Sequence, residues 1–143
     1  MQGPPPERKR EGVNIEDRLI DSFQYRVLVA GSRSYNDWDY FEKKMLGVLR
    51  YLKGRDFCFV SGKAPGVDTL IIEFCKKHNL PCFYYRAFWD YYGKSAGSIR
   101  NTEMSKVVNL AFLIWDGVSP GTQHMLSELK KRNVKNYLFI PKT

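Results

Sequence analysis

The sequence predicts a doubly wound α/β fold, in which a parallel sheet carries helices on both faces. Five short apolar runs, rich in β-branched and aromatic residues, alternate with segments whose apolar residues recur every three or four positions. Strands and helices that alternate in this way form a parallel sheet, because each helix returns the chain to the start of the next strand. The predicted strands lie at residues 25–30, 57–60, 82–88, 110–115 and 137–140.

The helices follow from apolar spacing and from the residues that end them. The first is predicted from Asp37 to Gly54, where the glycine stops it. The second spans residues 67–78 and ends at Asn79. Two more are predicted, at residues 96–104 and around residues 125–129.

The order of the strands locates the place where a ligand is expected. Right-handed crossovers leave few arrangements, and we predict the order 3-2-1-4-5 of a Rossmann-like domain. In that order the chain reverses direction between the first and fourth strands, and ligands of such folds bind beyond the C-terminal ends of the strands at this point. The loops after residues 25–30, 57–60 and 110–115 are therefore the decisive ones.

The first 22 residues differ in composition from the rest of the chain. They are rich in proline and mixed in charge, which predicts a flexible extension at residues 1–22 and a single domain at residues 23–143. Ile15, Leu19 and Ile20 are the one indication that part of the extension docks, as a short helix. Charges nearly cancel in the extension, so the net charge of +8 lies on the domain and favours anionic ligands.

Cysteines and histidines exclude several classes of protein. Cys58, Cys75 and Cys82 lie in apolar runs without CxxC spacing, which predicts reduced thiols and a cytoplasmic location. No stretch approaches the ~20 apolar residues of a membrane span, and the start of the chain lacks the apolar segment of a secretory signal. His78 and His124 have no metal-ligand spacing, so neither a metal nor a cofactor is predicted.

Two of the decisive loops combine glycine with groups that bind anions. Gly31 lets the backbone turn sharply after the first strand, and Ser32 and Arg33 add a hydroxyl and a guanidinium; a plain turn with an exposed arginine is the alternative. The second loop exposes N–H groups at a helix start. Asp68 in this loop suits a helix cap as well as a ligand contact. The candidate ligand residues of the second loop are Ser61, Gly62, Lys63, Gly66 and Asp68.

The loop after residues 110–115 also leads into a helix. Gly121 and Thr122 can hold phosphate oxygens through N–H groups and a hydroxyl. Ser119 as an N-cap before Pro120 is a compatible alternative. The candidates in this loop are Trp115, Asp116, Gly117, Ser119, Gly121 and Thr122.

A buried arginine is predicted on the helix at residues 96–104. Arg100 shares the inward face of this helix with Gly97, and Asn101 lies at the edge of that face. A charged group there is costly unless it is paired, so we predict that Arg100 faces an anionic ligand; a structural salt bridge is the alternative. Upstream lie aromatic residues that can stack on a base or form an oligomer contact: Trp89, Tyr91 and Tyr92.

Four motifs occur in order along the domain: GSR at 31–33, SGKAPGVD at 61–68, AGSIRNTEM at 96–104 and WDGVSPGT at 115–122. On these motifs the chain resembles the SLOG superfamily, which includes the DNA-processing Smf/DprA proteins and the Lonely Guy phosphoribohydrolases. Within it, the chain is most similar to small YspA-related stand-alone members, which phages often carry. The resemblance implies a nucleotide-type ligand facing the glycine-rich loops and Arg100, phosphate on Gly121 and Thr122, and a homo-oligomer.

The resemblance leaves the chemistry open. Lonely Guy enzymes carry a glutamate three residues after the Gly-Thr pair, whereas this chain has Met125, whose thioether cannot accept a proton. The leading hypothesis is a protein that senses or sequesters a nucleotide or a nucleotide-derived phosphate ligand. The second is a nucleoside 5′-monophosphate N-glycosidase with Arg100, Asp68 and Asp116 as candidate catalytic residues. The third is binding of single-stranded DNA, which the basic domain and its tyrosines favour.

Overall fold

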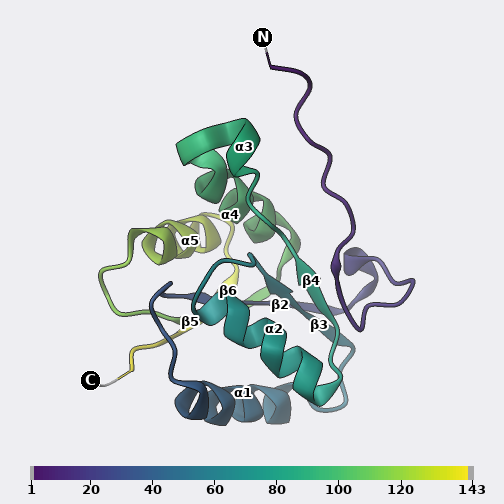
Figure 1. The fold of residues 1–143 in the computed structure, drawn as a ribbon. Helices are drawn as coiled ribbons and strands as arrows, with labels where there is room; N and C mark the ends of the chain where they lie inside the picture. Colours follow the sequence, from purple (N-terminus) through teal and green to yellow (C-terminus); the bar gives the residue numbers. More distant parts are fainter. Residues whose placement is uncertain (1, 142–143) are drawn as a thin grey trace.

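The computed structural model describes residues 2–141, which fold around a six-stranded sheet (Figure 1). The strand order is β1-β4-β3-β2-β5-β6. Strands β2 to β6 run parallel, and β1 is antiparallel to β4. The strands are β1 (Gly12–Val13), β2 (Tyr25–Gly31), β3 (Phe57–Ser61), β4 (Cys82–Tyr84), β5 (Leu110–Ile114) and β6 (Lys135–Phe139).

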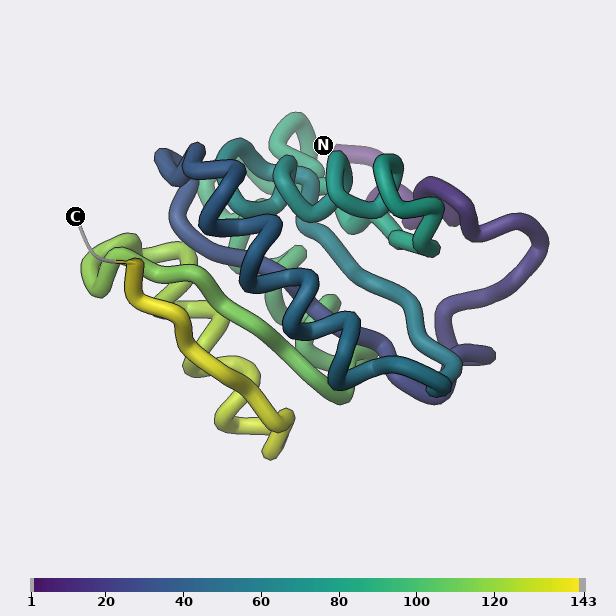
Figure 2. The backbone as a smooth tube through the Cα atoms, turned by 90° about the horizontal axis from the view of Figure 1, so that it is seen from below, coloured from purple at the N-terminus to yellow at the C-terminus, as the bar shows by residue number. Residues whose placement is uncertain are grey.

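Helices cover both faces of the sheet (Figures 1 and 2). Helices α1 (Trp38–Leu52) and α2 (Val67–His78) pack on one face, and α4 (Ala96–Val107) and α5 (Pro120–Lys131) pack on the other. The carboxylate of Asp37 accepts the N–H of Tyr40 at 3.1 Å and so caps the start of α1. A short helix, α3 (Trp89–Tyr92), and a 3-10 turn, η2 (Gly93–Ser95), precede α4.

The alternation of side chains along β2 divides the core into two layers. Val27 and Val29 face α1 and α2, while Leu28 and Ala30 face α4 and α5. A strand buried on both faces reads as a continuous apolar run, which is why these strands could be recognised in the sequence. The two helix layers are anchored by buried residues of their own, among them Phe41, Met45, Ile71 and Phe74 on one side and Met104, Met125 and Leu129 on the other.

The predicted fold class is confirmed, and the strand count is corrected from five to six. The five predicted strands are β2 to β6, and their mutual order is the predicted one. The added strand, β1, is two residues long and pairs only with the edge of β4, so it leaves no periodic pattern in the sequence. Of the run predicted as a strand at residues 82–88, only Cys82–Tyr84 forms the strand β4, because the chain then leaves the sheet.

Part of the N-terminal segment lies against the domain, and the flexibility expected for residues 1–22 stays a prediction. Gly12 in β1 approaches the carbonyl of Cys82 so closely that a Cβ there would lie 2.1 Å from the oxygen. Ile15 is buried, and Ile20 packs on the same small cluster, while Leu19 is 60% exposed. These contacts come from tertiary partners, which composition alone does not reveal. The division of the chain after residue 22 stays a prediction.

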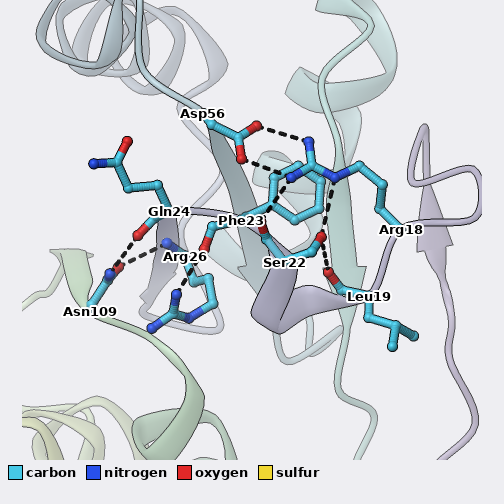
Figure 3. Close-up of polar contacts among 8 residues, drawn as sticks. All are labelled: Arg18, Leu19, Ser22, Phe23, Gln24, Arg26, Asp56 and Asn109. Carbon is cyan, nitrogen blue, oxygen red and sulfur yellow. Dashed lines mark hydrogen bonds and ion pairs between the residues drawn. The ribbon is translucent and has the colours of Figure 1, made fainter.

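Arginines fix this segment to the N-terminal end of the sheet (Figure 3). Arg18 donates two hydrogen bonds to the carboxylate of Asp56, at 2.8 and 2.7 Å. Arg26 in β2 donates to the carbonyls of Phe23 at 2.8 Å and Val107 at 2.5 Å. The side chain of Asn109 accepts the backbone N–H of Arg26 at 2.8 Å, which ties β2 to the segment before β5.

Two sequence predictions concern the environment of the protein. None of the described helices has both the length and the apolar character that crossing a membrane requires. Cys58, Cys75 and Cys82 are buried free thiols, and burial raises the pKa of Cys58 to about 12. The cytoplasmic location stays a prediction.

Candidate functional site

A cavity of about 560 Å³ lies at the C-terminal edge of the sheet, where the loops after β2, β3 and β5 meet α4. Its volume falls in the range of small-molecule sites. The starts of three helices, α2, α4 and α5, line the cavity. Nine of the predicted ligand residues line it: Gly31, Arg33, Asp68, Gly97, Arg100, Asn101, Ser119, Gly121 and Thr122.

Arg100 lies in the cavity wall and is only 7% exposed. Its Nε donates to Oδ1 of Asn101 at 2.9 Å, and its Nη1 donates to the carbonyl of Gly62 at 2.5 Å. Within residues 2–141, no carboxylate lies within 4.0 Å of the guanidinium, and Nη2 has no protein acceptor. The salt bridge that was the alternative is therefore absent. Burial lowers the pKa of Arg100, although a guanidinium keeps its charge in proteins.

Asp68 lies across Gly62 from Arg100. A Cβ at Gly62 would be 2.8 Å from Oδ2 of Asp68 and 2.9 Å from Nη1 of Arg100. A side chain at this position would therefore clash with both charged groups, so the space between them requires a glycine. Oδ2 of Asp68 accepts the N–H of Ala64 at 3.3 Å, which braces the loop before α2. Burial raises the pKa of Asp68 to about 6, against the opposing effect of the Arg100 charge. The carboxyl can therefore exchange a proton near neutral pH.

Asn101 connects Arg100 to the start of α5. Its Nδ2 donates to the carbonyl of Gly121 at 3.3 Å and lies 3.4 Å from Nδ1 of His124. The N–H groups of Gly121 and Thr122 fall in the first turn of α5, where they have no acceptor within the helix and the helix dipole is positive. This corner of the cavity thus combines a guanidinium with a helix start, two features that bind phosphate.

Eight predicted ligand residues belong to the same loops but do not line the cavity. They are Ser32, Ser61, Gly62, Lys63, Gly66, Trp115, Asp116 and Gly117. Ser32 is buried and its hydroxyl accepts the N–H of Asp116 at 3.1 Å, which joins the loops after β2 and β5. The hydroxyl of Ser61 donates to the carbonyl of Asp68 at 2.7 Å. Ser32 and Ser61 therefore hold the loops in place. The sequence pattern alone does not distinguish this structural role from ligand binding.

Asp116 and Trp115 organise the loop before α5. The carboxylate of Asp116 accepts the N–H groups of Val118 and Ser119, at 2.9 and 2.8 Å, and the hydroxyl of Ser119 at 2.8 Å. These hydrogen bonds lower the pKa of Asp116 to about 2. The indole of Trp115 donates to the carbonyl of Ser119 at 3.1 Å. Ser119 is the N-cap residue of α5, although its hydroxyl bonds Asp116 rather than the helix.

Gly66 shows why the second loop needs glycine. It has φ of +80°, and a Cβ there would lie 2.2 Å from the carbonyl oxygen of Ser32. The start of α2 therefore packs directly on the loop after β2. Lys63 also has positive φ, 57°, and its Nζ lies 5.0 Å from the centre of the Tyr84 ring.

No glutamate of the described chain reaches the cavity, and Met125 lines it at the position of the Lonely Guy glutamate. Glu128 accepts the hydroxyl of Thr102 at 2.5 Å and pairs with Lys131 at 3.0 Å, and these contacts lower its pKa to about 2. Glu103 pairs with Arg8 at 2.7 Å. Among residues 2–141, Asp68 is thus the one carboxylate that lines the cavity.

The charges of the cavity favour an anion. Arg33, Lys94 and Arg100 line it against the single carboxylate of Asp68, and neither Arg33 nor Lys94 forms an ion pair with another described residue. Lys94 was missed in the sequence, because the 3-10 turn that carries it has no periodic pattern. The predicted stacking residue Trp89 is 50% exposed and lines the cavity. Other lining residues that sequence reasoning did not identify as ligand contacts include Ser34, Ala64 and Ser98.

Within residues 2–141, no group of three or more His, Cys, Asp or Glu side chains is placed to hold a metal ion. The residues that could hold a ligand are instead hydrogen-bond donors and cations, supplied by the guanidinium of Arg100 and the first turn of α5. Such donors suit an anionic organic molecule.

Comparisons with known proteins bear on the family and the fold. Residues 25–92 match the YspA, cpYpsA-related SLOG family. The chain is 31% identical over 121 residues to the Gene 61 protein of Mycobacterium phage D29, an alignment that covers 76% of this chain and 91% of that protein. It is also similar to a solved structure on the single-stranded DNA binding mode of DNA processing protein A from Helicobacter pylori. That likeness has a TM-score of 0.62 and 14% identity, and it covers 86% of this chain and 68% of the other.

Proposed function

The chain belongs to the YspA, cpYpsA-related SLOG family, and from this premise we propose that it binds a nucleotide or nucleotide-derived phosphate ligand in the cavity at the C-terminal edge of the sheet. One observation carries the proposal: Arg100 is buried in the cavity wall with Nη2 free, next to the N-terminal turn of α5. A phosphate at this corner accepts hydrogen bonds from both. The exposed ring of Trp89 on the same cavity supplies a surface on which a base can stack.

Calorimetry against mononucleotides, cyclic nucleotides and ADP-ribose derivatives tests this proposal. We expect the wild-type protein to bind at least one class, and Arg100→Met to weaken that binding strongly because it keeps the apolar stem and removes the charge. Lys130→Met is the matched control, since it removes one charge from the exposed last turn of α5, away from the cavity. Failure of all three classes to bind the wild-type protein contradicts the proposal.

A second candidate is hydrolysis of the N-glycosidic bond of a bound nucleotide. The observation that favours it is Asp68, a cavity carboxylate with a pKa of about 6 beside a buried cation. Incubation with nucleoside 5′-monophosphates, followed by chromatography, measures the release of free base. We expect Asp68→Asn to abolish turnover and to keep binding. A wild-type protein that binds a nucleotide and releases no base excludes this candidate.

We also propose that the chain forms a homo-oligomer, as the family resemblance implies. Sedimentation velocity measures the mass in solution. A single species at the chain mass of 16.7 kDa contradicts it.

A further inference from the structure

A second groove, of about 450 Å³, lies between α1 and β6 on the opposite face of the sheet from α4 and α5. Figure 2 looks onto this face and shows β6 at the edge of the sheet, beside α1 and not beneath it. Phe112 of β5 and Tyr137 and Phe139 of β6 form the floor of the groove. Its wall is one side of α1, with Lys43, Lys44, Gly47, Val48, Arg50 and Tyr51.

The floor of the groove is a set of nearly parallel aromatic rings. The ring of Phe112 lies 5.4 Å from that of Tyr137, at an angle of 14°, and 6.0 Å from that of Phe139, at 16°. Phe112 and Tyr137 are direct neighbours in the parallel pairing of β5 and β6. Tyr137 is 39% exposed and Tyr51 on the wall is 45% exposed. The aromatic surface that remains accessible can therefore stack with a flat ring from outside.

Free cations surround these rings. Lys43, Lys44 and Arg50 line the groove, and none of the three is ion-paired within the described part of the chain. Among residues 2–141, no acidic side chain lines the groove. Lys135 adds a fourth cation, with Nζ 5.7 Å from the ring of Tyr137. Their charges are available to an external anion.

We propose that this groove binds a single-stranded nucleic acid, whose bases stack on the aromatic floor and whose phosphates pair with the cations of α1. Stacking needs bases with free faces, which a single strand has and a duplex lacks. A second copy of this chain fits the groove less well, because pairing like surfaces would bring the same cations together. The groove is separate from the cavity of Arg100, with which it shares no lining residue.

Fluorescence anisotropy with labelled oligodeoxyuridylate and oligouridylate of roughly twelve nucleotides tests the proposal, and because the two differ only in the sugar, the tighter one identifies the preferred sugar. We expect Tyr137→Ala to weaken binding by about tenfold or more, as loss of one stacked base does. We expect Lys43→Ala to reduce the slope of log affinity against log salt by about 0.7. A duplex of the same length should bind more weakly than the single strand.

Two control variants separate this groove from other sites. Lys130→Met removes a distant surface charge and Arg100→Met alters the cavity, and both should retain oligonucleotide binding. Thermal melting checks that each variant is folded. The proposal is overturned if single strands do not bind, if Tyr137→Ala binds them normally, if the duplex binds equally well, or if Arg100→Met abolishes binding. Absence of oligonucleotide binding, with a dimer that Tyr137→Ala dissociates, would assign the groove to a second copy instead.

Discussion

The two ends of the sheet use arginine in different ways. At the N-terminal end, Arg18 donates to the carboxylate of Asp56 and to the hydroxyl and carbonyl of Ser22, and Arg26 bonds the carbonyls of Phe23 and Val107. At the C-terminal end, Arg100 keeps Nη2 free and has no carboxylate within 4.0 Å among the described residues. Arg100 also bonds protein groups, Asn101 and the carbonyl of Gly62, but it does so in the wall of a cavity, where its remaining N–H groups can meet a ligand. Arg18 and Arg26 lie away from this cavity and tie segments of the fold together.

The largest expected effect is the pH dependence that Asp68 gives to stability. Its pKa in the folded protein is raised from 3.8 to about 6, so the folded state favours the neutral carboxyl. The contribution of this group is complete below about pH 4 and is lost as the pH rises through 6. Between pH 3 and pH 7, we expect the free energy of unfolding of the wild-type protein, relative to Asp68→Asn, to fall by about 3 kcal/mol.

Urea denaturation of both proteins across this pH range measures the difference. Asp68→Asn keeps all the other groups that titrate, including Asp116 and Glu128. Their effect on stability, between about pH 2 and their ordinary pKa values of 3.8 and 4.5, is therefore common to both proteins and cancels in the difference. Parallel pH profiles for the two proteins would mean that the Asp68 carboxyl is not buried beside Arg100 as described.

Arg100→Met should have the next largest effect, on affinity. The lost hydrogen bonds to an anionic ligand are charge-assisted and contribute about 1.5–3 kcal/mol, which corresponds to roughly 10- to 150-fold weaker binding. Stability should change less, because the guanidinium was buried at a cost. Calorimetry with a ligand identified for the wild-type protein measures the first quantity, and urea denaturation measures the second. Equal affinities would place the ligand elsewhere.

Arg26→Met should lower the stability and leave the ligand affinity unchanged, which is the reverse of Arg100→Met. It removes the bonds to the carbonyls of Phe23 and Val107 and leaves these acceptors half-buried, so we expect a loss of about 2 kcal/mol in the free energy of unfolding. Ligand affinity should be unchanged, because Arg26 lies at the other end of the sheet from the cavity. A variant that loses affinity while keeping its stability would contradict the division between the two ends.

The sequence predicted the elements that have a local apolar pattern, and it predicted less well the elements that depend on tertiary contacts. Strands β2 to β5 are apolar runs with buried residues, and helices α1 and α2 show regular apolar stripes. Strand β6 lies at the edge of the sheet and has no buried residue, and its apolar run at residues 137–139 is what revealed it. Strand β1 has neither feature, since its two residues are held by the edge of β4. The contact of Arg18 with Asp56 likewise depends on a partner that is distant in sequence, whereas the apolar character of Ile15 and Ile20 had indicated that this segment docks.

The same distinction holds for the candidate site. Topology alone brought the loops after β2, β3 and β5 to one edge of the sheet, and Arg100 faces the cavity there. The sequence could not decide which polar side chains face inward. Ser32 and Ser61 are the same residue types as binding hydroxyls, yet each bonds another loop group. Whether such a hydroxyl faces the cavity or bonds another part of the chain depends on side-chain geometry, which the spacing of residues in the sequence does not reveal.

The smallest expected effect is that of Arg18→Ala, and it measures how firmly the N-terminal segment is held. The Arg18 and Asp56 side chains are 43% and 46% exposed, so water and salt screen the pair in spite of its two short hydrogen bonds. The guanidinium also lies 3.6 Å from the centre of the Phe23 ring. We expect a loss of less than about 1 kcal/mol, and a smaller loss in high salt, measured by urea denaturation. A loss as large as that of Arg26→Met would mean that the segment and the sheet unfold as one unit held by this pair, since the exposed charges alone could not supply it.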